Sequence, residues 1–139
     1  MRRYLVVANQ TLLGDSLLGT IRQCLAAGPC QFYLVVPATH VSDHMVWTEG
    51  HDRAVAEGRL HEALERFRWL GADVGGEVGD ANAIEAVGDL LRRDPAFDHV
   101  ILSTLPPGAS RWLGQDLPHR LERAFHLPTT VLVSAVVAA

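Results

Sequence analysis

Residues 103–112 bring together side chains that could bind a small molecule. Two prolines and a glycine make this run rigid, and three hydroxyl groups stand near the guanidinium of Arg111. Hydroxyls and amides at a helix start bind oxyanions, and an arginine pairs with a phosphate or carboxylate through two parallel hydrogen bonds. One interpretation is an anion pocket. The other is a rigid turn in which Ser110 only caps a helix and Trp112 covers the end of the core.

Further polar residues, Asn9 and Thr11, follow the first apolar run of the chain. In an open parallel sheet, ligands bind beyond the carboxyl ends of the strands. Four segments follow predicted strands and are expected to border a site: residues 9–14, 37–47, 79–82 and 104–115. The predicted ligand-binding residues are Asn9, Thr11, Ser103, Thr104, Gly108, Ser110 and Arg111.

Histidines and aspartates gather between residues 40 and 52, which raises the question of a metal site. The residues concerned are His40, Asp43, His44, His51 and Asp52. Only a helix would bring the first two histidines onto one face, and Pro37 followed by a Ser-Asp pair indicates a loop instead. We therefore predict solvated loop histidines and no metal.

The sequence contains no recognisable motif for nucleophilic catalysis. All 12 basic residues are arginines, so a Schiff-base lysine, a phosphate-loop lysine and a lysine general base are excluded. Ser110 lacks a G-x-S-x-G context, and Cys24 and Cys30 form neither a CxxC pair nor a protease motif. A hydrolase of a phosphorylated or acyl substrate is the weakest function considered, and no catalytic residue is assigned.

The elements that must position these residues alternate regularly along the chain. Short β-branched runs predict strands at residues 4–8, 32–36, 72–78, 99–103 and 130–134. Three of them contain unbroken apolar runs, as expected of parallel strands that are covered on both faces. Helices must therefore lie on both sides of the sheet.

Amphipathic segments between the strands predict four helices. They are expected from residue 15 or 16 to 28, from 49 to 70, from 80 to 95, and from between 110 and 116 to 127. Asp80 is expected to cap the third helix. The solvated face of the second is expected to carry Arg59, Glu62, Glu65 and Arg66.

The amino-acid composition limits the classes of protein to which this chain can belong. The chain has 139 residues, 48% of them hydrophobic, which fits one domain over residues 1–139. A net charge of −4 does not favour nucleic acid as a partner. The apolar stretches are far shorter than the ~20 residues of a membrane span, and two lone cysteines suit a reducing compartment. We expect a cytoplasmic protein with buried, inert thiols and neither membrane nor nucleic acid as a partner.

The order of these elements and several short runs resemble the universal stress protein family. Residues 3–11 are similar to that family's opening strand, which ends in Val-Asp-Gly-Ser. Gly79-Asp80 before an Ala/Ile helix resembles its Gly-Asp-Pro helix start, and Pro128 falls on the proline before its final strand. The resemblance implies a three-layer α/β/α sandwich with five parallel strands in the order 3-2-1-4-5, a Rossmann-like fold shared with adenine nucleotide alpha hydrolases.

The ATP-binding motif of that family is replaced in this sequence. Members that bind ATP carry G-x-x-G, nine residues and G-[S/T] after the fourth strand; the corresponding residues here are Leu102, Leu105, Gln115 and Asp116. Glycine lets the backbone close around phosphates, and an aspartate cap would repel them. Asn9 also replaces the aspartate on the adenosine side. The resemblance is closest to a divergent bacterial branch without the glycine motif, so no cofactor is expected, and ATP is possible but disfavoured.

Two functions follow from the resemblance and the residues together. The first is a dimeric interaction or regulatory module, because the final strand of the family often pairs across a dimer axis. That interface would be formed by Thr130, Val131, Leu132 and Val133. The second is a binder of a nucleotide or another small anionic ligand, in a cleft at the carboxyl ends of the first and fourth strands.

Overall fold

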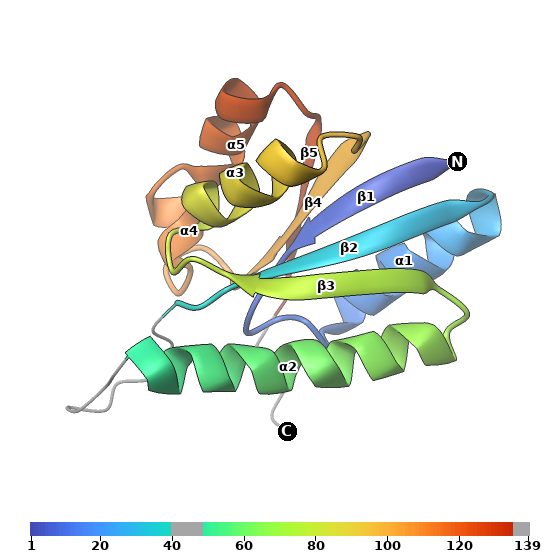
Figure 1. The fold of residues 1–139 in the computed structure, drawn as a ribbon, viewed down its shortest axis with the longest axis horizontal. Helices are drawn as coiled ribbons and strands as arrows, with labels where there is room; N and C mark the ends of the chain where they lie inside the picture. The colour runs from blue at the N-terminus through green and yellow to red at the C-terminus, as the bar shows by residue number, and fades with distance from the viewer. Residues whose placement is uncertain (40–48, 135–139) are drawn as a thin grey trace.

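A five-stranded sheet forms the centre of the protein (Figure 1). The structure, a computed structural model, describes residues 1–39 and 49–134. The strands are β1 (Arg2–Val7), β2 (Cys30–Pro37), β3 (Asp73–Gly79), β4 (His99–Thr104) and β5 (Thr129–Val133). All neighbouring strands are parallel, and their spatial order is β3-β2-β1-β4-β5. The predicted fold class and strand order are confirmed.

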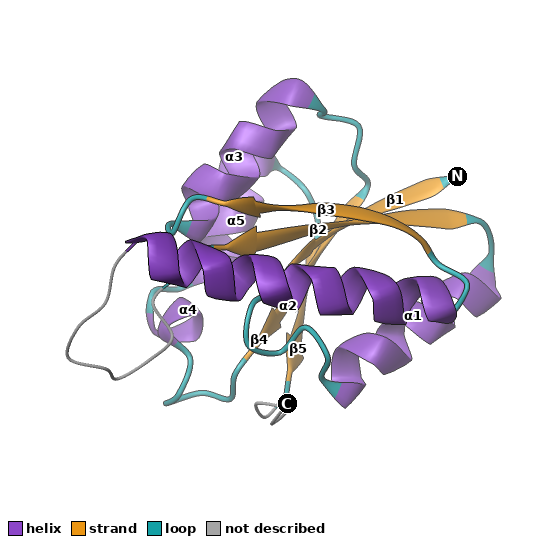
Figure 2. Cartoon of the chain, turned by 60° about the horizontal axis from the view of Figure 1, so that its bottom comes forward, coloured by secondary structure: helices purple, strands orange, loops and turns teal. Residues whose placement is uncertain are grey.

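Helices cover both faces of the sheet, as Figure 2 shows. The helices are α1 (Asp15–Ala27), α2 (Glu49–Trp69), α3 (Ala83–Arg93), α4 (Arg111–Gly114) and α5 (Leu117–Phe125). The first two pack on one face, and the other three lie on the opposite face. Within the described residues, no helix combines the length and the apolar character needed to cross a membrane.

The central strand β1 divides the interior into two cores. Successive side chains of a strand point to opposite faces. Val6 therefore packs with Leu17 and Phe67 of the α1–α2 layer, whereas Leu5 and Val7 pack with α3 and α5. All five side chains are fully buried, and each burial of this kind stabilises the fold by roughly 1.5–3 kcal/mol. The two cores hold the carboxyl ends of β1 and β4 as a fixed base for the loops beyond them.

The start of α3 lies three residues later than predicted. The helix begins at Ala83, and Asn82 caps it by accepting hydrogen bonds from two amides of the first turn, at 3.0 and 3.3 Å. Asp80, the predicted cap, instead accepts a hydrogen bond from the amide of Asn82 at 2.8 Å. Both side chains are short acceptors suited to a cap, and the one adjacent to the first helical residue takes the role.

The predicted last helix is two helices, α4 and α5, separated around Asp116. Asp116 has a φ of 56°, in the left-handed region, and its side chain makes no cap hydrogen bond. Its carboxylate is exposed and lies 2.9 Å from Nδ1 of His119. The sequence left open whether Asp116 caps this helix, and in the structure its side chain does not.

Candidate functional site

A cleft of about 500 Å³ opens at the carboxyl ends of β1 and β4. Each of the four predicted segments contributes to it: residues 9–11, Thr39, Ala81, and a group between Ser103 and Gln115. Six of the seven predicted ligand-binding residues line the cleft. The parallel sheet explains this convergence, because all its strands end on the same side.

Gly108 is the one predicted residue that does not line the cleft. It is exposed and has a φ of 90°, a conformation that glycine adopts without strain. The turn around it is closed by hydrogen bonds from the amides of Ala109 and Ser110 to the carbonyl of Pro106. Gly108 thus shapes the loop that brings Ser110 to the cleft.

Buried polar residues are concentrated in the walls of this cleft. Six buried polar or charged residues are found in the described chain: Asn9, Thr11, Asp52, Ser103, Thr104 and Ser110. All except Asp52 line the cleft. Burying a polar group costs free energy unless it is hydrogen-bonded, so this end of the sheet differs in kind from the apolar cores beneath it.

Two pairs of hydroxyl groups form the centre of the site. Thr11 Oγ1 lies 2.6 Å from Ser103 Oγ, and Thr104 Oγ1 lies 2.5 Å from Ser110 Oγ. Ser103 and Thr104 are neighbours at the end of β4, so their side chains point to opposite faces. One pair therefore joins β4 to the loop after β1, and the other joins it to the start of α4.

Counting protons shows that the hydroxyl pairs have hydrogen-bond donors to spare. Each hydroxyl carries one proton, and each pair uses one, whichever atom donates. The Ser110 oxygen additionally accepts a hydrogen bond from the amide of Leu113 at 3.1 Å, which caps α4. One O–H donor per pair is left without an acceptor among the described residues. Among the described residues no acidic side chain lines the cleft, so these walls favour a ligand with hydrogen-bond acceptors.

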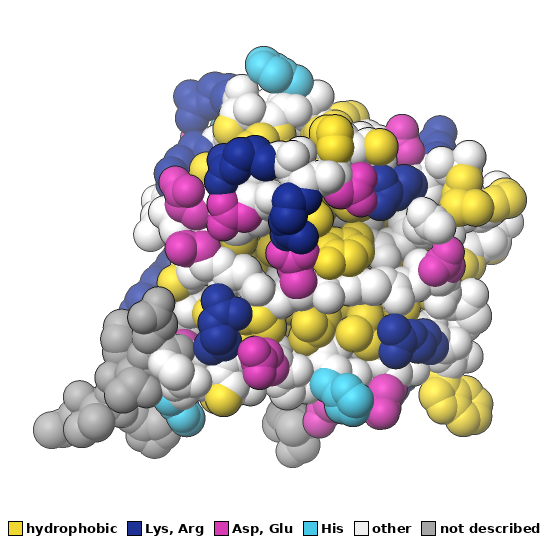
Figure 3. Space-filling model, in the orientation of Figure 1, with side chains coloured by type: hydrophobic (Ala, Val, Ile, Leu, Met, Phe, Trp, Pro, Cys, Tyr) yellow, Lys and Arg dark blue, Asp and Glu magenta, His cyan; other side chains and the backbone are white. Residues whose placement is uncertain are grey.

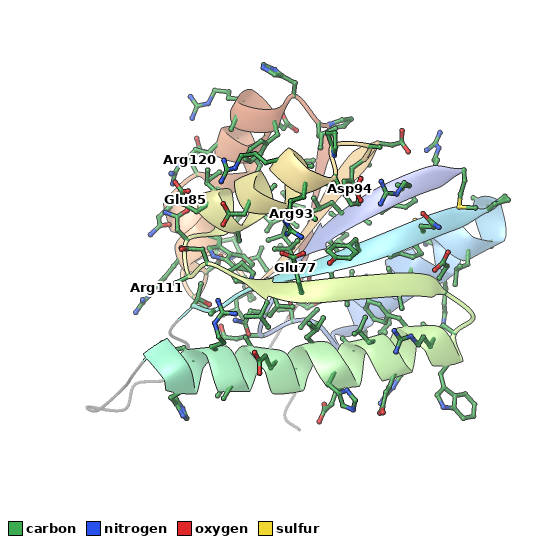
Figure 4. All side chains as sticks on the ribbon, in the orientation of Figure 1. Glu77, Glu85, Arg93, Asp94, Arg111 and Arg120 are labelled. Atoms are coloured by element: carbon green, nitrogen blue, oxygen red, sulfur yellow. The ribbon has the colours of Figure 1, made fainter. Side chains whose placement is uncertain are left out.

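Arg111 belongs to the rim of the cleft rather than to its floor. The side chain is exposed, and Figure 4 shows it extending away from the sheet. The predicted role as a fork for an anion would thus require Arg111 to turn inward.

Asn9 ties three elements together beside the cleft. Its Nδ2 donates to the carbonyl of Pro37 at 2.7 Å and to Thr39 Oγ1 at 3.2 Å. Its Oδ1 accepts a hydrogen bond of 2.6 Å from Nη1 of Arg59, on α2. The amide of Asn9 therefore links β1 to the end of β2 and to α2.

Arg59 was expected on the solvated face of α2, and that expectation is wrong. Glu62, Glu65 and Arg66 are exposed as predicted, but Arg59 is half-buried against Asn9. The neighbouring turns carry Ala56 and Ala63, both fully buried. Residues three and four apart share a helix face, so these alanines mark the buried stripe on which Arg59 lies. Burial lowers the pKa of the Arg59 guanidinium, and within the described chain no carboxylate pairs with it.

The histidine and cysteine candidates do not assemble a reactive centre in the part of the chain that the structure describes. His40, Asp43 and His44 lie outside the described residues, and among the others no three His, Cys, Asp or Glu side chains converge. Cys30 is buried as predicted, whereas Cys24 is only half-buried. Burial raises the pKa of the Cys30 thiol, which opposes formation of a nucleophilic thiolate.

Leucines occupy the positions that correspond to the glycines of the ATP motif. The side chain of Leu102 is fully buried in the α3–α5 core, and Leu105 lines the cleft together with Gln115. A side chain therefore stands at these positions where glycine would expose the backbone.

The fold and the cleft define a three-layer α/β protein with a polar site beyond the carboxyl ends of its parallel strands. Among solved structures, a universal stress protein from Archaeoglobus fulgidus aligns with a TM-score of 0.56 and 13% identity, over 96% of this chain and 93% of that chain. GalB, the 4-carboxy-2-hydroxymuconate hydratase of Pseudomonas putida KT2440, aligns with a TM-score of 0.47 and 19% identity, over 100% of this chain and 63% of that chain. No family model and no curated protein sequence matches the chain. The protein has the universal stress protein fold, as the sequence resemblance implied.

Proposed function

We propose that this chain is a module of the universal stress protein fold that binds a small ligand rich in hydrogen-bond acceptors. The observation that carries the proposal is the two pairs of buried hydroxyl groups, each with one O–H donor left over, in a cleft that no acidic side chain of the described residues lines. A nucleotide or another small anion is the class of ligand that such donors suit. A cytoplasmic location, which two unpaired thiols suit, is part of the proposal.

ATP held by its phosphates at the loop after β4 is not the ligand we favour. Leu105 adds a side chain to the cleft wall at a position where the ATP motif has glycine. The walls also lack a lysine, and Arg111 points outward. A smaller acceptor group that reaches the hydroxyls of Ser103 and Thr104 fits these walls better.

A thermal-shift screen of nucleotides, sugar phosphates and small carboxylic acids tests this proposal. A ligand at about 100 times its Kd stabilises the folded state by ~2.7 kcal/mol. The substitutions Thr11→Val and Thr104→Val remove hydroxyls at nearly constant volume and should weaken binding about tenfold or more. Thr20→Val, on α1 and outside the cleft, is the matched control. If no compound stabilises the wild-type protein at millimolar concentration, the proposal is wrong.

A second function, self-association through β5, is supported by a separate observation. β5 is an edge strand, and four large apolar side chains are exposed in the described chain: Met1, Trp69, Val131 and Val133. The two valines point the same way from β5, since they are two residues apart. An open edge with exposed valines is suited to pairing with a second copy, as a dimeric regulatory module would require.

A further inference from the structure

Arg59 brings a positive charge to the Asn9 side of the cleft. Its one hydrogen bond among the described residues goes to the neutral amide oxygen of Asn9. A guanidinium has five N–H donors, so four of them lack a protein acceptor in the part of the chain that the structure describes. Arginines that are taken out of water are normally paired with an acid.

The position of Arg59 connects this charge to the proposed ligand site. Asn9 and Thr39 both line the cleft, and both belong to the hydrogen-bonded chain that begins at Arg59. The guanidinium therefore lies directly behind one wall. No acidic side chain of residues 1–39 and 49–134 lines the cleft, so nothing in this part of the walls neutralises that charge.

The partial burial of Arg59 strengthens its electrostatic attraction for a charged ligand. An interaction between charges is weaker in water than near a protein surface, and salt screens partly buried pairs less than exposed ones. Arg59 is half-buried, whereas Arg111 is exposed and points away from the sheet. Of these two arginines, Arg59 is the better placed to select a charged ligand.

We infer that the ligand of this cleft carries a compact oxyanion, a carboxylate or a phosphate, that lies at the Asn9–Thr39 end of the cleft and is attracted by Arg59. The inference rests on the proposed function and adds to it the charge of the ligand and the end of the cleft that receives it. The spare hydroxyl donors of the Thr11 and Thr104 pairs then serve the other acceptors of the same ligand.

Matched probes that differ in charge test the inference. The phosphate arm compares adenosine monophosphate with adenosine and includes inorganic phosphate, and the carboxylate arm compares succinate with succinamide. We expect at least one anion to stabilise the wild-type protein and its neutral counterpart to bind about tenfold or more weakly. Whichever arm responds identifies the oxyanion.

Substitution of Arg59 distinguishes attraction of a ligand from a purely structural link. Arg59→Met should weaken binding of the responding anion about tenfold or more and leave binding of its neutral counterpart unchanged. Arg66→Met is the matched control, because Arg66 is an exposed arginine of the same helix. If Arg59→Met does not fold, Arg59→Gln replaces it. Titration of the wild-type protein needs no variant: rising ionic strength should weaken binding of the anion and not of the neutral probe.

The outcomes separate this inference from the proposed function. Equal binding of the anion to wild-type protein and Arg59→Met would overturn the inference, as would equal binding of the charged and neutral probes. In both cases, loss of binding in Thr104→Val would leave the proposed function standing. If none of the probes binds at millimolar concentration and the wider screen also fails, both are wrong.

Discussion

Ser110 lies where the loop after β4 passes into α4, and its side chain serves two neighbours at once. Its oxygen caps the helix by accepting from the amide of Leu113 and is hydrogen-bonded to Thr104. The sequence left two interpretations open, a helix cap or part of an anion pocket. The cap is present in the structure, and the same residue lines the cleft, so the two roles do not exclude each other.

Removing that hydroxyl should destabilise the protein. Ser110→Ala deletes a helix cap, worth about 1 kcal/mol, and leaves the buried Thr104 hydroxyl without its partner. We expect a total loss of about 1–3 kcal/mol in the free energy of unfolding, measured by urea denaturation. Ser16→Ala, which removes an exposed hydrogen bond to the carbonyl of Val133, is the control and should change little. Equal losses in the two variants would contradict this prediction.

His99 should make stability depend on pH near neutrality. Its Nε2 lies 2.6 Å from Thr130 Oγ1. Burial, assisted by the charge of Arg2 and opposed by that of Glu122, lowers the pKa of His99 below the ordinary value of 6.5. The unfolded chain therefore binds a proton more readily than the folded one, so this contribution is present above pH 6.5 and is lost as the pH falls through the folded-state pKa.

The measurement is the denaturation midpoint between pH 7 and pH 5. The wild-type midpoint should fall over this range, and His99→Gln should remove part of the fall, because glutamine does not titrate. A pH profile that is identical in the two proteins would show that His99 contributes nothing to it.

At the scale of elements, the strands could be predicted from the sequence and some helix boundaries could not. The unbroken apolar runs around Val6 and Val35 identified strands because a doubly covered parallel strand has no polar face. The similar run around Leu132 also forms a strand, but the expectation that it is covered on both faces is wrong, since β5 leaves Val131 and Val133 exposed. The left-handed turn at Asp116 had no equally clear signal. Pro118 in the first turn of α5 was the available one, because proline is favoured at helix starts.

The site residues that follow strands could likewise be predicted from the sequence, whereas the one on a helix face could not. Residues that follow predicted parallel strands could be assigned to the cleft, because the carboxyl ends of such strands lie at the same edge of the sheet. Arg59 could not, because it was grouped with the charged residues Glu62, Glu65 and Arg66, which indicated a solvated helix face. Only the packing of Ala56 and Ala63 against the sheet turns that part of the helix inward.

Close packing between β3 and α3 leads to a prediction for Gly79. A Cβ at Gly79 would lie 2.7 Å from Cβ of Ala86. Gly79→Ala should therefore destabilise the fold by about 1–3 kcal/mol through overpacking. Gly58, inside α2, has nothing within 4 Å of such an atom, so Gly58→Ala should stabilise by up to about 1 kcal/mol. Thermal denaturation of both variants checks the opposite signs, and a Gly79→Ala protein as stable as wild type would refute the packing argument.

At the scale of the whole molecule, charges of both signs are interspersed on the surface that carries α3 and β3, as Figure 3 shows. Arg93 of α3 and Glu77 of β3 approach each other there (Figure 4), at 2.6 Å, and Tyr33 donates to the same carboxylate. Burial and this carboxylate raise the pKa of Tyr33 to about 12. Such pairing leaves no broad field of one sign on this face.

Association through β5 is tested by sedimentation of the whole protein. We expect a dimer that Val131→Asp dissociates, since a charge placed on the exposed edge strand opposes pairing. Trp69→Asp is the control, because Trp69 is also exposed but lies at the end of α2. A wild-type protein that stays monomeric at high concentration would rule out this interface.

The indole of Trp112, half-buried in the cleft wall, gives the protein an optical reporter of its own. A ligand that enters the cleft displaces water next to this ring, and indole emission shifts in wavelength and intensity when its surroundings become less polar. Trp69, 89% exposed, stays in water throughout. In a protein with Trp47→Phe and Trp69→Phe, every change in tryptophan emission would therefore originate at the cleft, and occupancy could be followed in real time without a label.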